Sequence, residues 1–209
     1  MKINQIDVKI VKGDIATIKA DGYVVPQYRN DTSKTGVSAR MVCSPLYRAV
    51  MDYEMIAMYV AQIPFGYAIA VPVNVKRDIG PSHLIHVATL GVPENEAFKT
   101  IQLAVFAALK EAERCGLSEI AIPALGTGED APLDESMSAK AVLSAIASFK
   151  SMGSVTKVII PISKTGGMYR KFVGILRHNH VFESYIDNTL QEKYEELIRK
   201  MKRTSKINA

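Results

Sequence analysis

The chain has 209 residues, a formal net charge of +5, 48% hydrophobic residues and 22% charged residues, which is ordinary for a globular protein that buries a core without covalent staples. Two distant cysteines, Cys43 and Cys115, form no CxxC pair and no metal-ligand spacing, which argues against a disulfide framework or a zinc site. The sequence shows no apolar leader and no apolar run of about 18 residues. We therefore expect a soluble, cytoplasmic protein without metal or cofactor that does not cross a membrane.

Strand and helix patterns alternate along most of the chain. We expect strands over 6–10, 22–25, 67–73, 83–90, 119–125 and 155–162, and helices over 45–63, 101–115, 132–152, 168–177 and 182–201. This alternation predicts an α/β fold with three layers, in which helices cover both faces of a mixed, mostly parallel sheet. We expect the α/β domain to occupy residues 1–180 and a helical extension with a basic tail to occupy residues 181–209.

Three strands carry more detailed predictions. The first alternates polar and apolar residues, which is typical of a half-exposed edge strand. Pro26 is expected to stop the second strand. The last, over 155–162, is nearly continuous in valine and isoleucine and indicates a central parallel position.

The C-terminal helix has one apolar stripe and an opposite charged face. The stripe consists of Phe182, Ile186, Leu190, Tyr194, Leu197 and Met201. Such a helix either packs on its own domain or binds a partner, and the pattern leaves both open. The basic residues of the tail are Arg199, Lys200, Lys202, Arg203 and Lys206. They predict at most weak, salt-sensitive and sequence-independent nucleic-acid binding.

The most informative segment is the turn Gly126-Thr127-Gly128, between a strand and a helix expected to begin near Pro132. Glycines allow the backbone to approach a ligand closely, and the N-terminus of a helix attracts a phosphate. A tight connection that needs positive φ angles would have the same sequence. We expect Glu129 or Asp130 to cap the following helix, where it would compete with a bound anion.

Four segments occur in an order that resembles the macro domain family. They are Gly13-Asp14-Ile15-Ala16, Thr35 to Met41, the strand Leu84-Ile85-His86 and the loop Pro123 to Gly128. The resemblance extends from Lys9 to Phe172. It implies a macro-domain-like fold and the binding of ADP-ribose or a related adenine nucleotide.

The resemblance also implies a role for particular residues. Asp14 would accept a hydrogen bond from the adenine amino group, although an aspartate after Gly13 is also a common turn residue. Tyr169 or Met168 would cover the adenine. Two phosphate loops would hold the diphosphate. The complete ligand-binding set is Asp14, Ile15, Gly36, Val37, Ala124, Leu125, Gly126, Thr127, Gly128 and Tyr169.

The chain departs from the family pattern at the distal ribose. Many members have an Asn-Ala-Ala-Asn run there, whereas this chain has Val25 to Asn30, in which Gln27 or Asn30 are the candidate substitutes. Its first loop contains one glycine, Gly36. These departures weaken the case for hydrolysis and leave nucleotide binding as the leading function. Hydrolysis of ADP-ribosyl esters or of ADP-ribose 1''-phosphate is the alternative function, with Asp130 as the candidate for positioning a water. A scaffold that binds nucleic acid or protein through the basic C-terminal helix is a second alternative.

The histidines give little indication of a metal site. His83 and His86 occupy strand positions of opposite parity and are expected on opposite faces of the sheet. His86 is expected to be a hydrogen-bonded core residue. His178 and His180 have no carboxylate or thiol close in sequence to complete a site.

Overall fold

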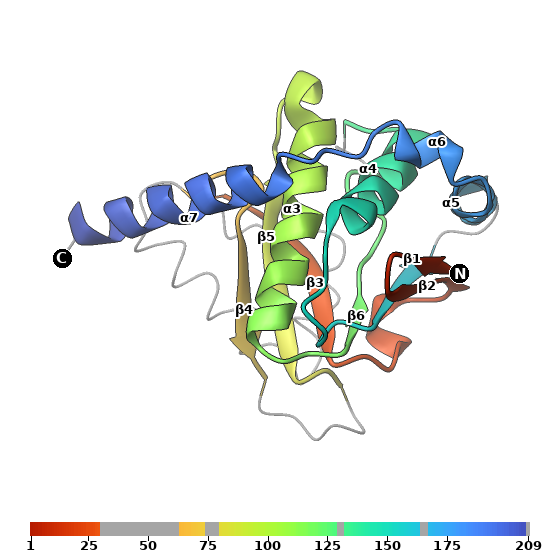
Figure 1. The fold of residues 1–209 in the computed structure, drawn as a ribbon, viewed down its shortest axis with the longest axis horizontal. Coiled ribbons are helices and arrows are strands. Elements are labelled where there is room, and N and C mark those ends of the chain that lie inside the picture. Colours follow the sequence, from red (N-terminus) through yellow and green to blue (C-terminus); the bar gives the residue numbers. More distant parts are fainter. Residues whose placement is uncertain (30–62, 74–79, 129–131, 164–166, 208–209) are drawn as a thin grey trace.

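The computed structural model of the chain describes residues 1–29, 63–73, 80–128, 132–163 and 167–207. The described elements form a mixed seven-stranded sheet with helices packed on it (Figure 1). In chain order they are β1 (Lys2–Ile3), β2 (Ile6–Lys12), the 3₁₀ helix η1 (Ile15–Thr17), β3 (Gly22–Tyr28), β4 (Ala68–Pro72), β5 (His83–Leu90), α3 (Glu94–Arg114), β6 (Glu119–Ala121), α4 (Glu135–Ser148), β7 (Lys157–Ile162), α5 (Gly167–Arg177), α6 (His180–Glu183) and α7 (Leu190–Ile207).

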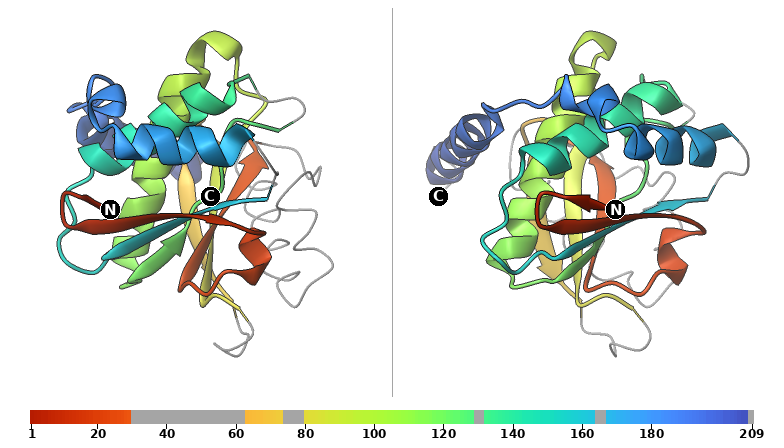
Figure 2. Two further views of the ribbon diagram at one scale, coloured as in Figure 1. Left: turned by 90° about the vertical axis from the view of Figure 1, so that its right-hand side faces the viewer. Right: turned by 45° about the vertical axis from the view of Figure 1, so that its right-hand side comes forward.

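The strand order is β1-β2-β7-β6-β3-β5-β4. The central strands β2, β7, β6, β3 and β5 are parallel, whereas β1 and β4 pair antiparallel at the two edges. This arrangement confirms the predicted α/β class with a mixed, mostly parallel sheet. Helices α3, α4 and α5 lie over one face of the sheet (Figure 2). The helix predicted over 45–63 falls almost entirely outside the described residues.

The first predicted strand is not at the edge of the sheet. β2 pairs with β7 on one side and with the two-residue strand β1 on the other. A turn at Asn4, with φ +52°, folds β1 back onto β2, and the Asn4 side chain donates to the main-chain oxygens of Ala147 and Phe149. A two-residue strand is too short to show an alternating pattern in the sequence. The predicted central position of β7 is confirmed, because it lies between β2 and β6.

Two predicted strand ends are also wrong. β3 continues through Pro26 to Tyr28, and Pro26 lies opposite Val87 of β5. The proline is tolerated because β6 pairs with β3 only at Gly22 and Tyr23, so Pro26 lies beyond that pairing. β6 ends at Ala121 rather than Leu125, and the residues after it form the loop described below.

Asp21 joins three strands where β3 enters the sheet. Its carboxylate oxygen Oδ2 accepts the main-chain N–H groups of Ser118 and Glu119, each at 3.0 Å. Its own N–H donates to Glu119 O at 2.8 Å, and its carbonyl accepts the N–H groups of Ser82 and His83. One residue therefore sets the start of β3 against both β6 and β5.

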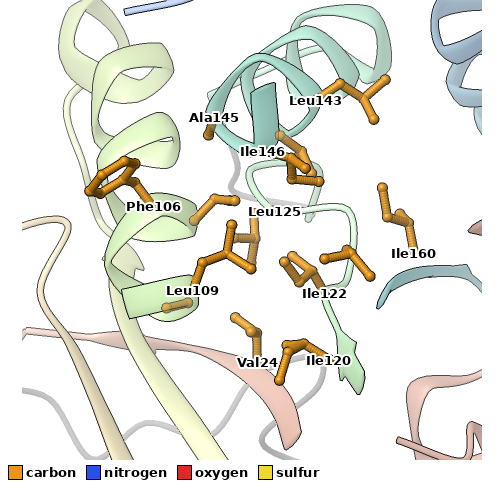
Figure 3. Packing of buried hydrophobic residues seen from close by; sticks show 14 of the residues in the cluster. Val24, Phe106, Leu109, Ile120, Ile122, Leu125, Leu143, Ala145, Ile146 and Ile160 are labelled. Atoms are coloured by element: carbon orange, nitrogen blue, oxygen red, sulfur yellow. The ribbon is translucent and has the colours of Figure 1, made fainter. Parts of the chain in front are cut away.

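The main core lies between the sheet and helices α3 and α4 (Figure 3). Val24 and Ile120 of the sheet face Phe106 and Leu109 of α3, all of them buried. Gly116, with φ +67°, follows α3, as expected for a glycine that ends a helix. This core holds the central strands in place below the loops that follow them.

The edge strand β4 is protected by α3. Glu111 reaches from α3 and accepts the Ala70 N–H at 3.2 Å, while Arg114 donates to the same carboxylate oxygen at 2.8 Å. Bonds from Val73 N to Ser82 O and from Ala88 N to Tyr67 O turn the odd-numbered positions of β4 toward β5. The outward-facing positions are therefore Ala68, Ala70 and Pro72.

The C-terminal extension packs on the domain, but it is not one continuous helix. Phe182 and Leu190 are buried in the main cluster, and Gln102 of α3 donates to Tyr185 O at 2.7 Å. The chain breaks at Asp187, whose Oδ1 accepts the N–H and the hydroxyl of Thr189, so that α7 begins at Leu190. Tyr194 of α7 lies against Phe106 of α3 and Leu197 is buried, and beyond these residues α7 projects from the body of the domain (Figure 1). None of the described helices is both long and apolar enough to cross a bilayer.

Replacing Asp21 should destabilise the fold without changing the secondary structure of the folded protein. Asp21→Ala removes a charged acceptor from two main-chain donors, and we expect a loss of about 2–3 kcal/mol in the free energy of unfolding. Asp21→Asn keeps one oxygen acceptor and should lose less. Urea unfolding of the three proteins measures this order, and equal stabilities would contradict the assigned role.

Asp187 should make the stability of the C-terminal extension depend on pH. Burial alone would raise the pKa of Asp187, but hydrogen bonds from Lys193 and Thr189 outweigh it and lower the pKa to about 2. This depressed pKa stabilises the fold above the unfolded-state pKa of about 3.9, and the effect is lost as the pH falls through about 2. The contribution should be about 1–2 kcal/mol, because part of the shift is screened by solvent.

The matched variant is Asp187→Asn, which cannot ionise. The difference in unfolding free energy between parent and variant should be constant above about pH 5 and should shrink between about pH 4 and pH 2. Thermal melting across this range measures the difference. A difference that stays constant down to pH 2 would show that Asp187 does not carry the effect.

Candidate anion-binding site

The carboxyl ends of the parallel strands meet at one edge of the sheet, where open α/β sheets bind their ligands. Gly13 and Asp14 follow β2 at this edge, the loop Ala124–Gly128 follows β6, and α5 follows β7. The register places β2 beside β7 and β7 beside β6. The structure therefore brings these predicted site segments to a common edge.

The loop Ala124–Gly128 has its carbonyl groups tied to the protein. Thr127 Oγ1 donates to Ala124 O at 2.8 Å, and Ser138 Oγ donates to Leu125 O at 2.6 Å. The Leu133 N–H donates to Gly126 O at 3.1 Å. Among the described residues, none accepts a hydrogen bond from the N–H of Leu125 or Gly126. Leu125 and Gly126 form a turn, which directs the N–H of Thr127 toward Ala124 O. The loop thus has the donor arrangement that a phosphate requires.

Packing holds this loop in place from below. Leu125 is buried in the main core, where it lies among the residues shown in Figure 3. Gly126 has φ +81°, and a Cβ at this position would lie 3.2 Å from Leu133 Cδ1. Glycine is therefore required at Gly126 both for the backbone conformation and for space. Gly128 is exposed, while Ala124 and Thr127 are half-buried.

The helix after this loop begins later than expected and has a different cap. α4 begins at Glu135, and its N-cap is Asp134, whose Oδ1 accepts the N–H groups of Ser136 and Met137 at 2.7 and 2.8 Å. The Met137 amide is the main reason that the pKa of Asp134 is lowered. The prediction that Glu129 or Asp130 caps this helix is wrong, since Asp134 already does so. The loop amides, rather than the end of α4, are the donors available for an anion.

Asp14 caps the short helix η1. Its Oδ1 accepts the Ala16 N–H at 3.1 Å, and its carbonyl accepts the N–H and the hydroxyl of Thr17. Ile15 is 4% exposed and packs with Tyr23 and other residues on the second face of the sheet. Any ligand contact of Ile15 would therefore come from its main chain.

Tyr169, of the two residues considered for covering a base, is the more accessible. Met168 is buried in the core, whereas Tyr169 is half-buried on the first turn of α5. The ammonium of Lys12 lies 5.1 Å from the centre of the Tyr169 ring. Lys12 precedes Gly13 and Asp14 directly, so this cation–π contact places Tyr169 beside the end of β2.

Other predicted residues lie elsewhere or are not described. Gly36, Val37 and Asp130 fall outside the described residues. Gln27 is buried, and its Nε2 lies 3.2 Å from Nδ1 of the fully buried His86. This pair confirms that His86 is a hydrogen-bonded core residue, and it places the Gln27 side chain inside the protein. Within the described part of the chain, no cluster of three or more histidine, cysteine or carboxylate residues could hold a metal ion.

Sequence analysis missed the residues that hold the loop. Ser138 lies 13 residues after Leu125, whose carbonyl it bonds, and Leu133 lies seven residues after Gly126, whose carbonyl it bonds. The sequence gives no sign of these two bonds. Thr127 was expected in the phosphate loop, and its hydroxyl instead bonds within the loop. The signal that could have indicated Ser138 is a small polar residue at an otherwise apolar face of a predicted helix.

The chain is similar to known proteins in its structure rather than in its sequence. No protein-family model and no curated protein sequence matches the chain. Among solved structures, the Oceanobacillus iheyensis macrodomain with ADP superposes with a TM-score of 0.71 at 18% identity, over 86% of this chain and 95% of that one. The chain has the macrodomain fold. At this identity the likeness establishes the fold alone.

Two further macrodomains show that the likeness is general. The Trypanosoma brucei macrodomain in complex with ADP has a TM-score of 0.63 at 12% identity, over 81% of this chain and 69% of that one. The macrodomain of Mycobacterium tuberculosis DarG has a TM-score of 0.61 at 17% identity, over 76% and 99%. The macrodomain fold of this chain therefore spans most of its length, as the four sequence segments predicted.

Proposed function

We propose that this macrodomain binds ADP-ribose or a related adenine nucleotide at the carboxyl edge of its sheet. The observation that carries the proposal is the loop Ala124–Gly128. The carbonyl groups of Ala124, Leu125 and Gly126 are each bonded within the protein, and the N–H groups of Leu125 and Gly126 have no acceptor among the described residues. Neighbouring main-chain donors of this kind bind the oxygens of a diphosphate.

The structural neighbours support the same ligand class. The Oceanobacillus iheyensis and Trypanosoma brucei macrodomains have been solved with ADP, and a variant of the former with ADPR. These ligands carry a diphosphate next to an adenosine. In this proposal the diphosphate lies on the loop Ala124–Gly128, with Asp14 toward the adenine amino group and Tyr169 beside the base.

The proposal concerns binding rather than turnover. Hydrolysis of an ADP-ribosyl ester or of ADP-ribose 1''-phosphate requires a positioned water beside the distal ribose. The residue suggested for that role, Asp130, lies outside the described residues, and Gln27 is engaged with His86 inside the sheet. Among the described groups, the arrangement that favours a ligand is the set of loop amides.

Calorimetric titration with ADP-ribose, ADP, AMP and adenosine tests the proposal. ADP-ribose and ADP should bind about ten-fold or more tightly than AMP, because their second phosphate engages additional loop amides. Adenosine should bind most weakly. A protein that binds none of the four, or that binds AMP as tightly as ADP, would contradict the proposed use of the loop.

Replacing Asp14 tests the adenine end of the site. We expect Asp14→Ala to weaken ADP-ribose binding by about 10- to 100-fold, because a hydrogen bond to a carboxylate contributes about 1.5–3 kcal/mol. The variant also loses the acceptor of the Ala16 N–H, so melting must be measured beside binding. Asp7→Ala is the control, since Asp7 is a β2 carboxylate distant from the carboxyl edge. Equal affinities of Asp14→Ala and the parent would remove Asp14 from the site.

A further inference from the structure

The orientation of a peptide group determines what a loop offers to a ligand. The C=O and N–H of one trans peptide point in opposite directions. A bond that holds the carbonyl of Leu125 toward the protein therefore turns the N–H of Gly126 the other way. The same reasoning links Ala124 O to the Leu125 N–H, while the bond from Leu133 N to Gly126 O holds the third peptide group of the turn. Three successive peptide groups are fixed in this manner.

Ser138 makes the deepest of these bonds. It is fully buried on the first turns of α4, and its hydroxyl donates to Leu125 O at 2.6 Å. The other two donors to the loop carbonyls are Thr127 Oγ1 and Leu133 N. They belong to the loop and to the segment just after it. Ser138 is thus the one member of the three that belongs to a regular helix, and α4 is anchored independently in the core.

We infer that Ser138 is a positioning residue for the anion site, which keeps the Leu125–Gly126 peptide in the orientation that presents its N–H to a phosphate. This inference rests on the proposed function, and Ser138 itself does not touch the ligand. It acts through the main chain of Leu125. The chemical class that the arrangement selects is a phosphate ester or diphosphate, because neighbouring main-chain N–H groups bind an anionic oxygen more strongly than a neutral one.

The loop has the freedom to adopt the wrong orientation without Ser138. The peptide in question joins Leu125 to Gly126, and a glycine occupies positive and negative φ about equally well. Without a donor on Leu125 O, that carbonyl lies buried and unsatisfied, which costs free energy. Rotation of the peptide relieves this cost by turning the carbonyl toward solvent. The carbonyl oxygen would then face the phosphate and repel it.

The first experiment compares Ser138→Ala with Ser144→Ala in the full chain. Ser144 is the matched control, because it is also fully buried in α4, and its hydroxyl bonds to Ala141 O and to Gln102 rather than to the loop. We expect Ser138→Ala to bind ADP-ribose and ADP about 10- to 100-fold more weakly, while adenosine affinity stays unchanged. Ser144→Ala should bind all three ligands like the parent. Melting curves identify any loss that comes from unfolding.

A second pair of variants tests the same principle outside the core. Thr127→Val removes the hydroxyl that donates to Ala124 O and changes the shape of the side chain little, whereas Thr127→Ser keeps the hydroxyl. We expect Thr127→Val to lose affinity for ADP-ribose and Thr127→Ser to retain it. Because Thr127 is half-buried, both variants should fold, so this pair decides the matter if Ser138→Ala does not fold.

The outcomes separate the inference from the proposed function. If the parent binds ADP-ribose and ADP but Ser138→Ala binds them equally well, the positioning role is overturned and the proposed function stands. If Ser138→Ala loses adenosine and ADP affinity in the same proportion, the role is structural only and the inference is overturned. If the parent binds neither ADP-ribose nor ADP, both proposals fall together.

Discussion

Asp21 sets the position of β3 between β6 and β5, and the geometry at the opposite edge of the sheet follows from it. Its carboxylate and its main chain bind residues at the starts of β6 and β5. Because a strand advances by about 3.3 Å per residue, a fixed start also fixes the level at which each strand ends. The loops at the carboxyl edge are therefore positioned by hydrogen bonds made at the amino edge. The buried core holds the strands in place between these two edges.

Two sets of main-chain donors lie close together at the carboxyl edge, and the structure assigns them different partners. The donors of α4 are taken by Asp134, a carboxylate that belongs to the protein. The donors of the loop Ala124–Gly128 face away from the carbonyl bonds that hold the loop. A charged cap on the helix thus keeps its dipole satisfied, while the neighbouring loop retains donors for a ligand. Separate partners allow the helix to remain stable whether or not the site is occupied.

The sequence predicted well those features that depend on long, regular patterns. The continuous valine and isoleucine of β7 indicated a central strand, and the apolar spacing ending at Gly116 indicated α3. The segments from Gly13 to Ala16 and from Pro123 to Gly128 were predicted as parts of one site, and both lie at the carboxyl edge of the sheet. These features follow from local periodicity and from glycine conformations, which a single sequence displays directly.

Other features depend on contacts between distant residues, and the sequence could not show them. β1 has only two residues, so the edge position of β2 was predicted wrongly. Three carboxylates, Glu129, Asp130 and Asp134, precede α4, and only the helix start reveals which of them caps it. The bond from Ser138 to Leu125 O depends on how α4 and the loop pack in three dimensions, and no periodic sequence pattern reveals it.

The protected edge at β4 has a consequence for how this protein behaves at high concentration. A strand from another molecule that approached this edge would need donors at the outward positions Ala68, Ala70 and Pro72. Pro72 has no N–H, and that of Ala70 is already held by Glu111, whose charge is in turn held by Arg114. A continuous ladder of main-chain hydrogen bonds to another molecule therefore cannot form at this edge. Natural proteins use such edges to resist assembly into aggregates and fibrils. An ion pair on one helix, with a buried carboxylate and an exposed guanidinium, thus helps to keep separate molecules apart.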